Sequence, residues 1–213
     1  MRILTLVLGF VVALGACAQE AAPAKYTEGK EYKVLPKPVR TITPGKIEVT
    51  EAFSYTCGHC YNFEPRIHAW EKGLPEDVAL VKLPVIWRPS MQMLARIMYT
   101  GQALGMQHEV DARVFAAIHK EKNKLASEGA VAAIFEELGV EKEKFKKTFN
   151  SFGVSSKVQQ ADARTRNMKV TGTPQMIVDG RFTVAATKQM GHEGMLKVVD
   201  FLVAKVRAER AAK

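Results

Sequence analysis

Cys57-Gly58-His59-Cys60 separates a segment that alternates like a strand, Ile47 to Tyr55, from a segment with helical spacing, Cys60 to Lys72. The two cysteines therefore fall where a strand ends and a helix begins. Unpaired backbone N–H groups and the helix dipole favour an anion at that position. A thiolate at Cys57 would be that anion, and a stabilised thiolate is a good leaving group in disulfide exchange. The stretch therefore indicates a redox site, with Cys60 as the more buried partner.

The order of patterns along the chain predicts the fold class. Val78 to Trp87 has the composition of a second buried strand, and from Ser90 to about Met168 the apolar residues recur at helical spacing. Strand patterns return at Thr173 to Val184 around Asp179-Gly180, a pair that favours a tight hairpin turn. A last amphipathic helix follows. This order predicts an α/β unit split by an all-helical insertion.

The first residues are expected to be an export signal rather than part of the fold. Arg2 precedes an apolar run from Ile3 to Leu14, which is too short for a stable helix across a bilayer. The following small residues fit cleavage before a lipidated Cys17, and they also fit ordinary cleavage after Ala18. In either case Cys57 and Cys60 are the two thiols that remain, and a single CxxC in an exported chain is typical of a redox motif.

Length and charge exclude few classes of protein. The chain has 213 residues, of which 47% are hydrophobic, enough for a sizeable core. Its formal net charge of +9 would suit a nucleic-acid partner, but the basic residues alternate with acids in runs such as Glu141 to Lys147. Such runs are typical of solvated helix faces. We therefore expect no nucleic-acid partner.

Two other interpretations of the CxxC compete with the redox site. A zinc site needs four ligands, and the chain has no second CxxC and no pair of histidines at ligand spacing. An inert structural disulfide would close a very short loop and give little stabilisation. We expect no metal and no soluble cofactor, because the electrons move between sulfurs. His59 is the expected tuning residue, since a cationic or donating imidazole beside Cys57 favours the anion.

Two further positions are candidates for the site. Thr173-Pro174 opens a strand, and this proline is either ordinary punctuation or a cis-proline that leaves backbone groups free beside the sulfurs for a bound peptide. Glu51 shares a strand face with Phe53, so an acid points into the core just before the cysteines. Glu51 either relays a proton to Cys60 or is a structural acid paired with Lys82 on the neighbouring strand.

With these motifs the chain resembles the DsbA family of thioredoxin-fold disulfide oxidases. The resemblance runs from about Tyr26 to the C-terminus and is carried by Tyr26 to Tyr32, Glu51 to Glu64 and Thr171 to Phe182. It implies that Cys57 is the attacking thiol, Cys60 its partner in a redox-active disulfide, and Glu51 the buried acid behind them. It also implies that Pro174 is the cis-proline, with Thr173 before it in the substrate-binding loop.

The resemblance implies a division of the chain into two parts of one thioredoxin-like domain around a helical insertion. The expected segments are an export signal at 1–18, a tether at 19–25, the first thioredoxin-like part at 26–88, the helical insertion at 89–168 and the second thioredoxin-like part at 169–213.

Two positions depart from the family's usual pattern. Gly58 stands where most members have proline, so the tetrapeptide is similar to that of protein disulfide isomerase. Thr173 stands where valine is common. Glycine adds backbone freedom in the first helical turn and can change how N–H groups meet the Cys57 sulfur. These two departures bear on the redox poise and on the choice of reoxidising partner.

Methionines and tryptophans supply two more expectations. Met91, Met93, Met98 and Met106 make the start of the insertion methionine-rich, which fits core filling or a plastic apolar groove for unfolded substrates. Trp70 and Trp87 are expected in the core.

The predicted function is the introduction of disulfides into newly exported proteins in the periplasm. The expected partners are reduced, unfolded exported proteins and a DsbB-like, quinone-linked membrane oxidase, with the enzyme a monomer that Cys17 would anchor if lipidated. The alternatives are an envelope isomerase or reductase, and a lipid-anchored chaperone that does no redox chemistry.

Overall fold

A five-stranded mixed sheet forms the centre of the molecule, and the computed structural model describes residues 25–212. The strand order is β1-β5-β4-β2-β3, with β2 and β3 parallel and every other neighbouring pair antiparallel. The strands are β1 (Lys33–Val34), β2 (Ile47–Phe53), β3 (Val78–Pro84), β4 (Gln175–Val178) and β5 (Phe182–Ala185). All seven residues of the central strand β2 are buried, as expected for a strand covered on both faces.

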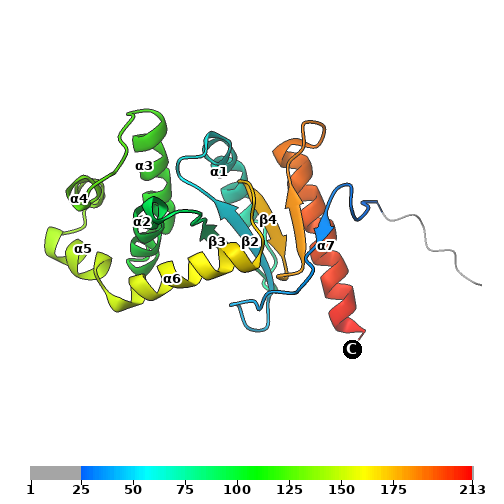
Figure 1. The fold of residues 1–213 in the computed structure, drawn as a ribbon. Helices are drawn as coiled ribbons and strands as arrows, with labels where there is room; N and C mark the ends of the chain where they lie inside the picture. Colours follow the sequence, from blue (N-terminus) through cyan, green and yellow to red (C-terminus); the bar gives the residue numbers. More distant parts are fainter. Residues whose placement is uncertain (1–24, 213) are drawn as a thin grey trace, which may run out of the picture.

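Helices cover both faces of this sheet (Figure 1). They are α1 (Gly58–Glu71), η1 (Pro89–Met91), α2 (Gln92–Ala103), α3 (Gln107–His119), α4 (Glu128–Glu137), α5 (Lys142–Phe149), α6 (Phe152–Asn167) and α7 (Gly191–Ala211). Met176 shares an apolar cluster with α1 and α7, whereas Ile177 shares another with the helices between β3 and β4. Because neighbouring residues of a strand point to opposite faces, these two groups of helices lie on opposite sides of β4.

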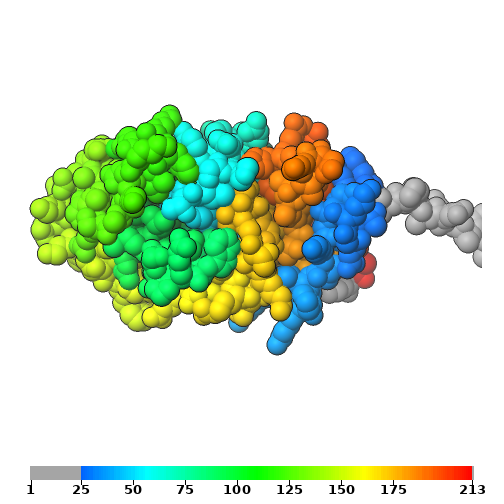
Figure 2. All heavy atoms as spheres, turned by 45° about the horizontal axis from the view of Figure 1, so that its top comes forward, coloured from blue at the N-terminus to red at the C-terminus, as the bar shows by residue number. Residues whose placement is uncertain are grey.

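The structure has the predicted fold class, an α/β unit whose strands β3 and β4 are separated by a run of helices. Figure 2 shows these helices, coloured green and yellow, filling one half of an elongated body, with the strands and α7 in the other half. The α6 helix runs from the helical half to the sheet (Figure 1). There the Arg164 guanidinium lies 2.6 Å from a carboxylate oxygen of the fully buried Glu48 on β2. The helical block is therefore fastened to the sheet by a buried ion pair.

The hairpin forms where its turn residues predict it. Asp179 and Gly180 both adopt positive φ angles, 53° and 61°, and the Arg181 N–H donates to the Val178 carbonyl at 2.9 Å. Positive φ at both central residues defines the type I′ turn that suits a right-twisted hairpin. A side chain at Gly180 would also collide with the Val39 carbonyl, so only glycine fits there.

The second buried strand, β3, is shorter than predicted, and Trp87 does not lie where it was predicted. β3 ends at Pro84, not at Trp87, because proline has no N–H with which to continue a ladder. Beyond it the chain leaves the sheet, and Trp87 is 49% exposed, so its expected place in the core is wrong. Trp70 is partly buried and donates its indole N–H to Asp200 at 2.8 Å.

None of the helices among residues 25–212 is long and apolar enough to cross a membrane. The predicted export signal, the tether up to residue 24 and the candidate lipidation site Cys17 lie outside the described residues.

Candidate active site

Cys57 is the N-cap residue of α1, four residues after the end of β2 at Phe53. Its backbone is extended, with φ −87° and ψ 115°, and its sulfur accepts a hydrogen bond from the Cys60 N–H at 3.4 Å. An N-cap side chain meets the unpaired N–H groups of the first helical turn, and here that side chain is a thiol. Cys57 is partly exposed and Cys60 is fully buried, and both are free thiols in this structure. It therefore presents the dithiol form of the pair.

The two thiols differ in how readily they ionise. Burial raises the pKa of Cys57, but hydrogen bonds from the Thr173 side chain and from the backbone of Cys60 and His59 outweigh it and bring the pKa below its ordinary value. Burial raises the pKa of Cys60 far above its ordinary value, and the Cys57 sulfur raises it further. The reachable sulfur is therefore the one that ionises first.

The loop before β4 lies against the reachable sulfur. The peptide bond between Thr173 and Pro174 is cis, and the Cys57 thiol donates a hydrogen bond to the Thr173 carbonyl at 3.3 Å. This contact favours the neutral thiol, whereas the N–H of Cys60 favours the thiolate. The N–H group prevails, because it belongs to a helix N-terminus whose dipole also favours the thiolate.

A cluster of buried charged groups lies behind the cysteines. The Lys82 Nζ is 2.7 Å from both carboxylate oxygens of Glu64, 2.9 Å from Asp111 Oδ2 and 3.7 Å from Glu51 Oε2. Tyr55 donates its hydroxyl hydrogen to Asp111. One ammonium group thus faces three carboxyl groups, and it lies closest to Glu64 and Asp111. The structure places Glu51 beside Lys82, the pairing that the structural alternative predicts, and Lys82 shares its charge with two other acids.

Glu51 is the least satisfied member of this cluster. It is fully buried, and neither of its carboxyl oxygens has a hydrogen-bond partner within residues 25–212. Burial raises the pKa of Glu51 to about 8, against the attraction of Lys82 and with the repulsion of Glu64 and Asp111. Glu51 therefore holds a proton at neutral pH, and once ionised its negative charge raises the pKa of the Cys60 thiol.

Gly58 and His59 are both exposed in the first turn of α1. The His59 side chain lines a groove of about 650 Å³ with the Thr173-Pro174 loop and His192. The described residues include no hydrogen bond between its imidazole and the Cys57 sulfur, and His59 lowers the pKa of Cys57 through its backbone N–H. A side chain at position 58 would meet no atom within 4 Å.

A second hollow opens on the other side of the reachable sulfur. Cys57 and Thr173 line a space of about 370 Å³ together with Trp87 and Met91. Met91 and Met93 also line a larger hollow of about 940 Å³ on the helical half, whereas Met98 is fully buried. The methionine-rich segment therefore contributes both to the core and to the apolar surface beside the thiol.

Four residues of this site were not among the sequence candidates: Tyr55, Glu64, Asp111 and His192. Asp111 is fully buried in α3, next to the apolar stripe that contains Val110 and Val114. An acid beside such a stripe is the signal that would have marked it, in the way that Glu51 was marked on its strand. His192 lies at the start of α7, far along the chain, and no local pattern places it near His59.

Comparisons with known proteins show the family to which the chain belongs. Residues 75–197 match the family model described as a DSBA-like thioredoxin domain. The thiol:disulfide interchange protein DsbA of Pseudomonas aeruginosa is 40% identical over 206 residues, which cover 97% of this chain and 96% of the relative. The DsbA of Azotobacter vinelandii is 35% identical, with 95% of this chain and 98% of the relative covered.

Solved structures give the same result. The crystal structure of Pseudomonas aeruginosa DsbA superposes with a TM-score of 0.83 and 41% identity, covering 88% of this chain and 97% of the other. The oxidoreductase DsbA from Xylella fastidiosa superposes with a TM-score of 0.78 and 30% identity, covering 86% and 98%. The fold and the family together define a thiol:disulfide oxidoreductase with a thioredoxin-like fold. Within that class, the chain belongs to the DsbA family, whose activity is the introduction of disulfides.

Proposed function

We propose that Cys57 and Cys60 form the disulfide that this enzyme passes to reduced proteins. The observation that carries the proposal is the Cys57 sulfur at the N-cap of α1, reachable from solvent and supplied with N–H donors, with Cys60 buried behind it. This arrangement stabilises the reduced pair, with Cys57 as the thiolate and Cys60 as the thiol. The oxidised pair is therefore the form that gives its disulfide away.

The exchange has two steps. A substrate thiolate attacks the Cys57 sulfur, the bond between Cys57 and Cys60 breaks, and Cys60 leaves with the electron pair. Glu51, which carries a proton at neutral pH, is the proposed donor of the proton that Cys60 takes up. A second thiolate of the substrate then attacks the first substrate sulfur, and Cys57 leaves as a stabilised thiolate. Two substrate thiols are oxidised to a disulfide, and the enzyme pair is reduced.

Thr173 and Pro174 are the proposed docking point for the substrate chain. The Thr173 backbone lies beside the Cys57 sulfur at the start of β4, where an extended peptide can pair with free backbone groups. Hollows on both sides of this point are lined by His59 and His192 on one side and by Trp87 and Met91 on the other. Gly58 and His59 are the proposed tuning residues, through the backbone geometry of the first turn.

We propose the periplasm as the place of action, reduced exported proteins as the substrates and a quinone-linked, DsbB-like membrane oxidase as the partner that restores the disulfide. The support is the apolar N-terminal run, the single CxxC and the relatives. We also propose that the enzyme works as a monomer. Mass spectrometry of the mature N-terminus tests whether a lipid on Cys17 anchors the protein to the membrane. An acylated Cys17 would establish the lipid anchor, and a chain that starts at Gln19 would rule it out.

The experiment for the proposed function is oxidation of a reduced test protein by the oxidised enzyme. The readout is the activity that the test protein regains when its disulfides form. Wild type should transfer one disulfide per enzyme, and Cys57→Ala should transfer none. Equal rates would remove the proposal. Gly58 favours one alternative, an isomerase or reductase, and a reduction potential near that of thioredoxin would support it. Holding activity that survives in Cys57→Ala, with no oxidation by wild type, would support the chaperone.

A further inference from the structure

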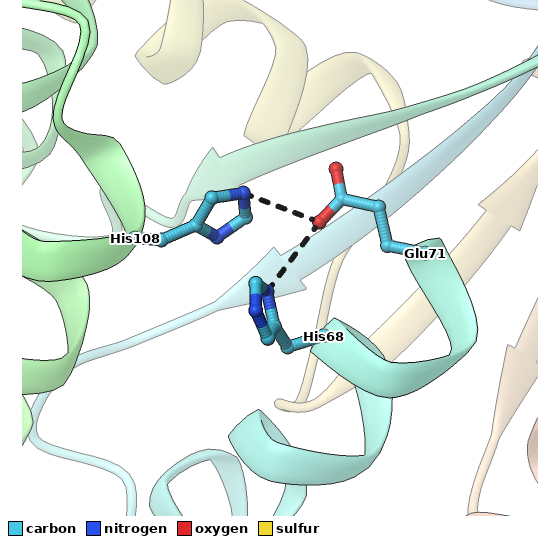
Figure 3. Close-up of side chains that lie close together, drawn as sticks. All are labelled: His68, Glu71 and His108. Atoms are coloured by element: carbon cyan, nitrogen blue, oxygen red, sulfur yellow. Dashed lines mark ion pairs between the residues drawn. The ribbon is translucent and has the colours of Figure 1, made fainter. Parts of the chain in front are cut away.

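Three side chains from two helices meet at the end of α1 that lies away from Cys57. His68 and Glu71 stand in the last turns of α1, and His108 stands in the first turn of α3. Glu71 Oε2 is 3.6 Å from His108 Nε2 and 4.0 Å from His68 Nδ1. Each of these three atoms lies within 4.8 Å of the other two. Figure 3 shows a ring nitrogen of each histidine facing the same carboxylate oxygen.

The nitrogen and oxygen atoms of this cluster are available as ligands for a metal ion. His68 Nδ1 is buried and has no hydrogen-bond partner within residues 25–212. The side chains are 36%, 32% and 48% exposed for His68, Glu71 and His108, so an ion can reach them from solvent.

The spacing suits a metal ion after a small closure. Zinc bonds of about 2.0–2.1 Å in tetrahedral geometry place ligand atoms about 3.4 Å apart. The closest pair here is already 3.6 Å apart, and the widest has to close by up to about 1.4 Å, which half-exposed side chains can do by rotation. The neighbouring Lys82 does not oppose a cation strongly, because Glu64 and Asp111 lie within 2.9 Å of its ammonium group.

We propose that His68, Glu71 and His108 bind one divalent transition-metal ion, with Zn²⁺ as its representative. Two imidazoles and one carboxylate favour Zn²⁺, Cu²⁺ and Ni²⁺ over Mg²⁺ and Ca²⁺, which prefer oxygen ligands. Water fills the remaining coordination positions. The spacing of residues along the chain does not reveal this site, because its ligands come from an i, i+3 pair on α1 and a single histidine on another helix.

A bound ion would join the two halves of the molecule. α1 carries Cys57 at its start, and α3 belongs to the helical block between β3 and β4. At 1.5 Å per residue, the ion lies about 16–21 Å along α1 from Cys57, so it leaves the thiol site free. A ligand that binds only the folded state raises stability by mass action, and here it would do so by clamping α1 to α3.

The test uses the full oxidised protein, so that Cys57 and Cys60 are held in their disulfide and cannot bind metal. Any other thiol is alkylated, and bound metal is removed with a chelator. Titration with Zn²⁺ in a calorimeter should show one ion per chain. His108→Ala and Glu71→Gln should each weaken binding by roughly tenfold or more, since even outer-shell partners cost that much. Both residues are half-exposed, so the variants should fold.

The matched control is Glu109→Gln, an exposed acid next to His108 that is outside the cluster. It should bind Zn²⁺ like wild type. Zn²⁺ should also raise the melting temperature of wild type and of Glu109→Gln, but not of His108→Ala. Electron paramagnetic resonance of Cu²⁺ should report two nitrogen ligands in wild type and fewer in His108→Ala. No stoichiometric Zn²⁺ binding by wild type, or equal affinity in all four proteins, would overturn the proposal.

Discussion

Glu51 is the residue on which the proposed proton transfer depends, and it lies behind the cysteines with Lys82, Glu64 and Asp111. Its alternation with Phe53 on a strand just before the cysteines predicted a buried acid behind the thiols, and it is fully buried. The surrounding cluster was not predicted beyond Lys82. Glu64 and Asp111 come from α1 and α3, and no local periodicity specifies that two helices bring their carboxyl groups to one ammonium group. The cluster decides the chemistry, because it leaves Glu51 as the member that holds a proton.

Glu51→Gln should change how stability depends on pH. The ordinary pKa of 4.5 rises to about 8 on folding, so the folded state binds more protons than the unfolded state between these two values. The free energy of unfolding therefore falls as pH rises through that window, by up to roughly 1.4 kcal/mol per pH unit. The variant lacks this site, so its decline should be shallower.

Urea unfolding of the reduced proteins at a series of pH values measures this difference. The titrating groups outside this cluster are common to both proteins, so the difference between the curves reports Glu51 together with its coupling to Glu64 and Lys82. Parallel curves for wild type and Glu51→Gln would mean that Glu51 is ionised throughout and cannot supply a proton to Cys60.

At the scale of elements, α1 shows which local signals suffice. The helix begins at Gly58, directly after its thiol N-cap, and continues through Pro65 to Glu71. The end of β3 was predicted too late, because the apolar residues after Pro84 continue the strand composition although the chain has left the sheet. Composition therefore predicted where α1 and β3 lie along the chain. It did not predict where β3 ends, because that depends on the missing N–H of Pro84.

Gly58→Pro should stabilise the oxidised enzyme. Position 58 is the first residue of α1, where proline loses no helical hydrogen bond, and an added Cβ meets no atom within 4 Å. Nor does the Gly58 N–H contribute to the hydrogen bonds that lower the pKa of Cys57. Proline restricts the unfolded chain, so we expect a gain of about 0.4–1 kcal/mol in guanidinium unfolding. A loss of stability would show that glycine is required for the backbone of the first turn.

At the scale of the whole molecule, the order of strand and helix patterns predicted a helical run between β3 and β4. The pattern did not show how that run is attached. Glu48 is the buried anchor on the sheet, and it accepts hydrogen bonds from the Ile42 N–H and the Thr50 hydroxyl as well as from Arg164 on α6. The partners are far apart in sequence, so only the folded chain reveals them.

Arg164→Met should destabilise the protein strongly, because it leaves the Glu48 charge buried without its cation. Breaking a buried pair from one side costs about 3–5 kcal/mol. The matched control is Arg166→Met on the same helix, which removes an exposed pair with Asp162 and should cost less than about 1 kcal/mol. Urea unfolding of both variants measures the contrast. Similar losses in the two would mean that the attachment of α6 does not depend on Glu48.

Ionisation of Cys57 in the reduced enzyme tests the central claim most directly. The ultraviolet absorbance of the thiolate, followed against pH, should show one thiol that ionises below the ordinary thiol pKa of 9.0, with Cys60 remaining protonated well above it. The early transition should disappear in Cys57→Ala. A first transition at or above the ordinary value would contradict the account, because Cys57 would then have no advantage as a leaving group.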